Sequence, residues 1–438
     1  MMKHSIPTEM RIFILIWLGQ LVSFIGSGLT DFALGVWVYQ RTGSATQLAL
    51  ISLSSTLPLI VCSAVAGTLV DRWNRRWVMI LSDCGAGLIT GVLVLFMVVG
   101  RLEIWQMYLA TAISSCFRAF QWPAYTASIT LLVPKKHLDR ANGMIQFAEA
   151  ATLLISPVLG SVLLLIIQLQ GIFLLDFATF VFSLITLLLV RFPNLKTTDA
   201  NQAGNNSLLR DVIYGWGYIN ARPGLRSLLI FFATANFLFG IEGVLVKPLV
   251  LSFASSTVLG IIQSIGGIGM LLGSLGISTL GGPKRRINTI FVFMLLSGLC
   301  TLFSGVRASV ALLILTNFLS FFGQPIINTS IQVIFQKKVA PEVQGRVFAI
   351  RRMIAWSTVP LAYLVGGWLA EKVFEPLMVP NGFLAATIGQ IIGVGSGHGI
   401  GLLFIVVGTL LILVTIAAYQ YPPLRLVEDE LPDVIPMI

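Results

Sequence analysis

Charged residues are scarce in this sequence. Asp, Glu, Lys and Arg together make up 11% of its 438 residues, against about a quarter in soluble globular proteins. Long polar segments are missing too, and the longest, Phe192–Arg226, is too short to form a hydrophobic core. Hydrophobic residues reach 56% and the mean hydropathy is +0.91. The chain is therefore predicted to be an integral membrane protein without a separate soluble domain.

Cysteine and histidine are also rare, which bears on the chemistry available to the chain. The four cysteines all fall inside apolar runs, so neither a disulfide framework nor a metal cluster is predicted; they are Cys62, Cys84, Cys116 and Cys300. No nucleophile or His-carboxylate set converges in the sequence. We expect no metal, no cofactor and no enzymatic activity.

Nucleotide-binding motifs are missing as well. No G-x-x-x-x-G-K-[ST] occurs, and the alternating glycines of Gly393–Gly401 never give G-x-G-x-x-G, so no ATP site is expected in this chain. A separate ATPase partner stays open. We expect Gly393–Gly401 to be a flexible entry to the last span, with His398 solvated. The net charge of +10 does not indicate nucleic acid, because the basic residues are scattered through short loops.

Long apolar runs dominate what is present. A transmembrane helix needs about 20 mostly apolar residues, and this measure gives six candidates in each half of the chain. They cover residues 12–39, 46–70, 77–99, 104–133, 142–168 and 171–191, then 226–252, 256–281, 287–306, 309–336, 347–371 and 400–421. The predicted fold is an all-α membrane protein with twelve transmembrane helices.

The basic residues predict the orientation of these spans. Of the 28 lysines and arginines, 22 fall at the N-terminus, the tail and the alternate loops on that side, and four fall in the opposite loops. Because lysine and arginine accumulate in cytoplasmic loops, both termini are expected to be cytoplasmic, in a multi-pass protein of the plasma (inner) membrane.

Four segments are predicted along the chain. Residues 1–191 form a first six-helix bundle, 192–225 a cytoplasmic linker, 226–421 a second six-helix bundle, and 422–438 a cytoplasmic tail. Apolar residues from Leu208 to Ile219 recur at helical spacing, which indicates an amphipathic helix at the membrane surface. A buried linker helix is the alternative.

The two halves look related. Pro123 and Pro325 occupy equivalent spans, and each follows Phe and Gln within a few residues. A short basic loop follows each of these spans. Two pseudo-symmetric bundles are therefore expected.

Residues 67–76 form a charged turn between two apolar runs. They read Gly-Thr-Leu-Val-Asp-Arg-Trp-Asn-Arg-Arg. This resembles the G-x-L-x-D-R-x-G-R-R loop between the second and third helices of the major facilitator superfamily, with Asn74 in place of the second glycine. Asparagine adopts the left-handed backbone conformation at modest cost, so a tight turn is expected at Asn74. The resemblance implies a cytoplasmic gate formed by Gly67, Asp71, Arg72, Arg75 and Arg76; an ordinary basic loop is the alternative.

Two further stretches resemble the macrolide-efflux branch of that superfamily. They are Phe32–Gly35 continuing to Thr42–Ala45, and Phe120–Tyr125 continuing to Arg140–Gly143. The resemblance implies two bundles that rock between inward-open and outward-open states and export small molecules in exchange for protons. Alternatives are transport of a lysophospholipid or a siderophore-like metabolite, or a non-transporting membrane sensor or scaffold.

Five ionisable residues lie inside the predicted spans, where charge is costly and usually faces a cavity or a partner. They are Asp31, Arg118, Glu149, Glu242 and Lys247. One or more of the three carboxyls is predicted to carry the proton, because burial favours the neutral form and a cationic substrate favours the charged form. Arg118 is expected to neutralise a carboxylate or to hold an anionic group of the substrate. A static ion pair is the alternative for Arg118, and snorkelling to water is the alternative for Asp31 and Lys247.

Aromatic residues in the same spans are candidates for contact with a large apolar substrate. They are Phe120, Trp122, Phe147, Phe239 and Trp356. Aromatic side chains also serve as lipid-facing anchors, and this alternative stays open for each of them.

Overall fold

Every regular element in the described part of the chain is a helix. The computed structural model describes residues 8–133, 138–190, 208–280, 283, 285–340 and 343–430. These residues divide into two compact units, one containing residues 1–43 and 50–202 and the other containing residues 44–49 and 203–438.

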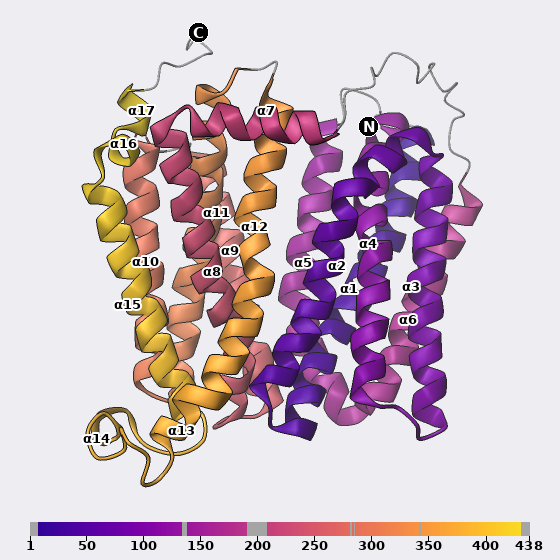
Figure 1. Cartoon of the computed structure of the whole chain (residues 1–438). Helices are drawn as coiled ribbons and strands as arrows, with labels where there is room; N and C mark the ends of the chain where they lie inside the picture. The colour runs from indigo at the N-terminus through magenta and orange to yellow at the C-terminus, as the bar shows by residue number, and fades with distance from the viewer. Residues whose placement is uncertain are drawn as a thin grey trace, which may run out of the picture. The chain divides into compact units, whose positions relative to one another are not determined.

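Six long helices build the first unit, and Figure 1 shows how they are arranged. They are α1 (Thr8–Thr42), α2 (Ala45–Arg72), α3 (Arg75–Val98), α4 (Ile104–Leu132), α5 (Leu138–Ile166) and α6 (Gln168–Leu189). Short connections join consecutive helices, so neighbours in sequence run in opposite directions.

Six long helices also build the second unit, together with shorter pieces. The long helices are α8 (Pro223–Leu251), α9 (Ser256–Leu280), α10 (Arg286–Val306), α11 (Val310–Lys338), α12 (Gln344–Leu369) and α15 (His398–Gln420). The shorter helices are α7 (Leu208–Asn220), η4 (Ala370–Phe374), α13 (Glu375–Met378), α14 (Gly389–Ile392), α16 (Pro422–Arg425) and α17 (Val427–Glu430). Helix α7 runs across one end of this unit, against α8 and α12 (Figure 1).

Eleven helices of the described residues are long and apolar enough to span a membrane. The other long helix, α4, has 29 residues and carries Arg118 and Gln121, which lower its hydropathy. The chain is therefore a multi-pass membrane protein, and the predicted all-α fold class is confirmed. Proline does not interrupt the spans, because α4 continues through Pro123 and α11 through Pro325.

The order of packing repeats between the two units. In the first unit, α1 packs on α5 and α6, while α3 packs on α4 and α6. In the second unit, α8 packs on α12 and α15, while α10 packs on α11 and α15. The first and third long helices of each set of six thus have equivalent neighbours, as expected for a fold built from two related halves.

Glycines bring α10 and α15 into backbone contact. A Cβ atom added at Gly408 would lie 2.7 Å from the carbonyl oxygen of Gly298, and one added at Gly401 would lie 2.8 Å from that of Gly305. In each helix the two glycines are seven residues apart, so they lie on one face. Small residues allow membrane helices to approach this closely.

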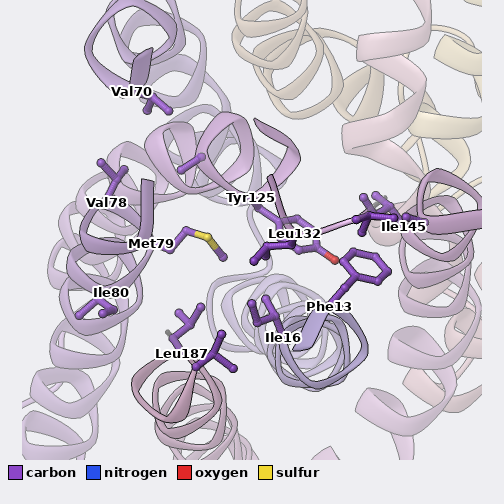
Figure 2. Packing of buried hydrophobic residues seen from close by; sticks show 14 of the residues in the cluster. Phe13, Ile16, Val70, Val78, Met79, Ile80, Tyr125, Leu132, Ile145 and Leu187 are labelled. Atoms are coloured by element: carbon purple, nitrogen blue, oxygen red, sulfur yellow. The ribbon is translucent and has the colours of Figure 1, made fainter. Parts of the chain in front are cut away.

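A hydrophobic cluster fills the first unit near the end where α2 meets α3. Phe13 from α1, Met79 from α3, Tyr125 from α4 and Leu187 from α6 are at most 1% exposed and converge here (Figure 2). Trp122 packs against this cluster from α4. The cluster holds the inner surfaces of four helices together around the polar groups described below.

The turn between α2 and α3 differs from expectation at Asn74. Its backbone is extended, with φ −67° and ψ 112°, and its side chain accepts a hydrogen bond from the backbone N–H of Arg76. Asn74 is therefore the N-cap of α3 and does not adopt the left-handed conformation. The expectation for residues 393–401 also changes, because His398 is the first residue of α15 and its Nδ1 atom is buried.

Candidate functional site

The first unit holds an ion pair between two of the predicted transport residues. Arg118 of α4 donates a hydrogen bond of 3.0 Å from Nη1 to Oδ2 of Asp31, on α1. Their side chains are 46% and 50% exposed, respectively. Arg118 follows fourteen residues of α4 and Asp31 precedes the last turns of α1, so both lie within helices rather than in the connecting loops. The pair is thus accessible from outside the helix packing.

A second carboxylate adjoins this pair. Asp176, from α6, is 2% exposed and accepts hydrogen bonds from the hydroxyls of Thr30, at 2.8 Å, and Ser27, at 3.4 Å. Arg118 also interacts electrostatically with Asp176. Helices α1, α4 and α6 thus each contribute one charged group: an accessible carboxylate, a guanidinium and a buried carboxylate.

A polar network lies deeper in the same unit, around Asp83 of α3. Its Oδ2 atom accepts hydrogen bonds from Gln20 Nε2, at 3.2 Å, and from Ser183 Oγ, at 2.9 Å. Its Oδ1 atom accepts one from Gln121 Nε2. Gln121 also donates to Gln20 Oε1 at 2.9 Å, and Gln20 donates to Ser183 Oγ at 2.8 Å.

This Asp83 network joins four helices through five hydrogen bonds, three of which end on the Asp83 carboxylate. Both side-chain amides and the hydroxyl use their hydrogens within it, while Asp83 only accepts. Asp83 is 1% exposed and Gln20 is fully buried. Since an unmatched buried donor is costly, the network favours one arrangement of α1, α3, α4 and α6.

Asp83 and Asp176 were not among the predicted site residues. Both are single carboxylates in apolar runs, and the cost of charge in hydrocarbon, which identified Asp31, applies equally to them. Gln20 and Gln121 gave no comparable signal, because a neutral amide in a membrane helix is compatible with many packing positions.

The other predicted transport residues do not join this group. Glu149, on α5, is exposed, and no hydrogen bond or ion pair connects it with another described residue. In the second unit, Glu242 of α8 accepts a hydrogen bond of 2.8 Å from the hydroxyl of Thr301, on α10. Lys247 lies one turn further along α8 and is half-buried.

Three of the five predicted aromatic residues lie in the first unit and have aromatic neighbours. Phe120 stacks on Trp73, with ring centroids 6.5 Å apart. Trp122 lies 6.0 Å from Phe24. Phe147 is 59% exposed and lies 6.4 Å from Trp17. Phe147 is thus accessible, whereas Phe120 and Trp122 pack against the hydrophobic cluster of the first unit.

The remaining two aromatic residues lie in the second unit. Trp356, on α12, is 53% exposed, and Phe239, on α8, is half-buried. Among the described residues, no ring contact joins these two side chains.

Only part of the predicted gate can be described. Gly67, Asp71 and Arg72 lie in the last turns of α2, and their side chains are outside the described part of the chain. Arg76 donates from Nε to the carbonyl oxygen of Leu187, at 3.2 Å, and from Nη2 to that of Leu188, at 3.0 Å. These carbonyls belong to the last turn of α6, whose oxygens have no partner inside the helix.

The site offers carboxylates and a guanidinium but no metal-binding geometry. Within the described residues, no three His, Cys, Asp or Glu side chains gather closely enough to hold a metal ion. The chemistry available to this arrangement is the exchange of hydrogen bonds, protons and ionic contacts.

Comparison with known proteins relates this chain to membrane transporters. The model of the Major Facilitator Superfamily matches residues 16–362. Macrolide efflux protein A of Streptococcus pyogenes is 27% identical over 368 residues, which cover 82% of this chain and 90% of that protein. Multidrug efflux pump Tap of Mycolicibacterium fortuitum is 26% identical over 369 residues, covering 82% and 89%, respectively.

Solved structures share the fold at low sequence identity. The crystal structure of the nucleoside transporter NupG matches with a TM-score of 0.70 and 16% identity, covering 94% of this chain and 99% of that chain. A bacterial homologue of the human lysosomal transporter Spinster matches with a TM-score of 0.67 and 14% identity, covering 98% and 100%. At these identities the comparison supports the fold alone.

Proposed function

This chain belongs to the Major Facilitator Superfamily, and we propose that it exports small amphipathic or hydrophobic molecules by alternating access, in exchange for protons. The transporter assignment follows from the family, and the protein is not an enzyme. Substrate type, direction and coupling ion are the proposed parts.

The ion pair between Arg118 and Asp31 carries the proposal. A charge in the hydrocarbon region costs at least about 2.5–3.5 kcal/mol on insertion scales. Both side chains are about half exposed, although they lie within the helices of a membrane domain. A half-exposed ion pair at this position is reasonable only where water or a polar ligand reaches it, so the pair supports a hydrated transport pathway.

Proton coupling is proposed for the carboxylates around Arg118. When a cationic or polar substrate contacts Asp31, it competes with the guanidinium for the same oxygen atoms. Asp176, which also interacts electrostatically with Arg118, then remains available to the guanidinium. Substrate binding and the protonation of either carboxylate are thereby linked, because both change the charge balance of one three-residue group.

Two further carboxylates are proposed as secondary members of the proton pathway. Glu242 is held by Thr301 in the second unit, and Glu149 is exposed on α5. Lys247 and the gate residues at the end of α2 complete the proposed pathway.

Export is proposed from the relatives. The similar proteins are named as macrolide and multidrug efflux pumps, and the aromatic residues of α4 and α5 suit an apolar substrate. We also propose that both termini and residues 192–225 are cytoplasmic, since 22 of the 28 lysines and arginines then lie on the cytoplasmic side.

Drug susceptibility of cells tests this function. A strain lacking the protein is compared with one that expresses it, across amphipathic antibiotics and dyes, with and without an uncoupler. Expression is expected to raise the inhibitory concentration of at least one compound, and the uncoupler is expected to remove this protection. Arg118→Gln should abolish it, whereas Arg101→Gln, in the exposed loop between α3 and α4, should not.

Two outcomes would contradict the proposal. If lysophospholipid or a siderophore inhibits transport and none of the drugs does, the protein has a different substrate. Purified protein that moves none of the compounds in liposomes would indicate a sensor or scaffold.

A further inference from the structure

A basic cavity lies at one end of the second unit, outside the transport residues. Its volume is about 420 Å³, within the range of about 300–1,000 Å³ typical of small-molecule sites. It is enclosed by the start of α10, the end of α11, the end of α15 and the short helices α16 and α17. Among its described lining residues are five basic side chains, Arg285, Arg286, Lys337, Lys338 and Arg425, and two acidic ones, Glu428 and Asp429.

The two acidic residues offset only part of the charge of the five basic ones. The carboxylate of Glu428 accepts a hydrogen bond of 2.8 Å from the backbone N–H of Ile287, in the first turn of α10. Asp429 is exposed. Within the described residues, no ion pair joins Arg285, Arg286 or Arg425 to a carboxylate.

The cavity wall is built by specific contacts. Lys338 is 5% exposed, and its Nζ atom donates a hydrogen bond of 2.6 Å to the carbonyl oxygen of Glu428. The guanidinium of Arg425 lies 5.7 Å from the ring centre of Tyr419. These contacts fix α16 and α17 against α10 and α11, so the arginines converge on a preformed space.

The chemistry of this cavity suits phosphate. Arginine forms paired, charge-assisted hydrogen bonds with phosphate oxygens, and basic pockets between transmembrane helices bind anionic lipid headgroups. Tyr419 is 49% exposed beside the cavity, and tyrosine is enriched at the level of the headgroups. We propose that this cavity binds a phosphate-bearing anion, supplied either by an anionic phospholipid headgroup or by a soluble phosphate compound.

Binding measurements on the delipidated full-length protein test the site. The lipid arm uses nanodiscs of phosphatidylcholine with increasing phosphatidylglycerol, and the soluble arm uses inorganic pyrophosphate in detergent. Thermal unfolding and native mass spectrometry report binding in both arms. At least one probe is expected to stabilise the protein in a saturable manner, and the arm that responds identifies the source.

Paired variants separate a specific site from general attraction to anions. Arg285→Gln/Arg425→Gln removes two exposed charges from the cavity and should weaken binding at least about tenfold. Arg101→Gln/Arg307→Gln removes two exposed arginines elsewhere, one of them at the other end of α10, and should leave the affinity unchanged. Arg285→Lys/Arg425→Lys retains the charge and should restore part of the affinity. No binding of either probe, or equal weakening in the two glutamine pairs, would overturn the proposal.

Discussion

The hydroxyl of Ser183 donates a hydrogen bond of 2.9 Å to the carboxylate of Asp83, and both side chains are at most 1% exposed. The same hydroxyl accepts from Gln20, so Ser183 connects α6 to both α1 and α3. The first unit is thereby held together by a polar interaction as well as by its hydrophobic cluster.

Removal of this hydroxyl should destabilise the protein. Ser183→Ala leaves Gln20 without one acceptor and Asp83 without one donor, at a cost of about 1–3 kcal/mol for a buried group. Ser128→Ala is the matched control, because Ser128 is about equally buried and, among the described residues, its hydroxyl bonds only to the carbonyl of Tyr125 in its own helix. The free energy of unfolding in detergent checks both. Equal losses in the two variants would show that the Asp83 network does not connect the helices.

Arg76 should stabilise the end of α6. Arg76→Ala removes two hydrogen bonds to the carbonyls of Leu187 and Leu188 and a positive charge at a helix C-terminus, which is favourable there. Amide hydrogen exchange in the last turn of α6 is expected to accelerate about 5- to 30-fold. Arg101→Ala should not change it. If Arg76→Ala abolishes transport but leaves amide hydrogen exchange in α6 unchanged, Arg76 acts at the gate and not by stabilising α6.

The close contact of α10 and α15 predicts intolerance of a single methyl group. Gly408→Ala places a Cβ atom 2.7 Å from the carbonyl oxygen of Gly298, and the resulting strain should cost about 1–3 kcal/mol. Gly276→Ala is the control, since a Cβ atom there meets nothing within 4 Å and alanine favours helix. Thermal unfolding of the purified variants should rank Gly276→Ala above Gly408→Ala; the opposite order would refute the close packing.

A double neutral variant distinguishes a working ion pair from a static one. Asp31→Asn/Arg118→Gln removes both charges of the ion pair at once. Asp176 loses its interaction with Arg118 but keeps its hydrogen bonds from Thr30 and Ser27, so folding stability should remain within about 1 kcal/mol of wild type. Transport should nevertheless be lost, because the exchangeable charges are gone. Retained drug export in cells expressing this variant would assign the pair to helix packing alone.

Much of the fold was predictable because the membrane imposes a length on each apolar run. The twelve predicted spans correspond to long helices, although α4 is less apolar than the other eleven. The backbone conformation of Asn74 was harder to predict from the sequence, since asparagine suits both a left-handed turn and an N-cap. Because α3 starts at Arg75, Asn74 is its N-cap.

The sequence indicated which residues form the site, but not which of them contact one another. Charge within an apolar run identified Asp31 and Arg118, but their contact depends on how α1 and α4 pack, and residues 87 positions apart carry no local signal of this. The same rule applied to every apolar run would have added Asp83 and Asp176. The bonds from Gln20 and Gln121 could not be anticipated, because they depend on the rotation of each helix about its axis.

Proton movement in liposomes tests the central claim most directly. Purified protein is reconstituted with a pH-sensitive dye, and a compound that the wild type exports is added without a pre-existing pH gradient. We predict that this compound drives proton flux in the wild type and in Glu103→Gln, a loop control, and that Asp31→Asn abolishes the flux. Export without proton flux in the wild type, or undiminished flux in Asp31→Asn, would contradict proton exchange through this site.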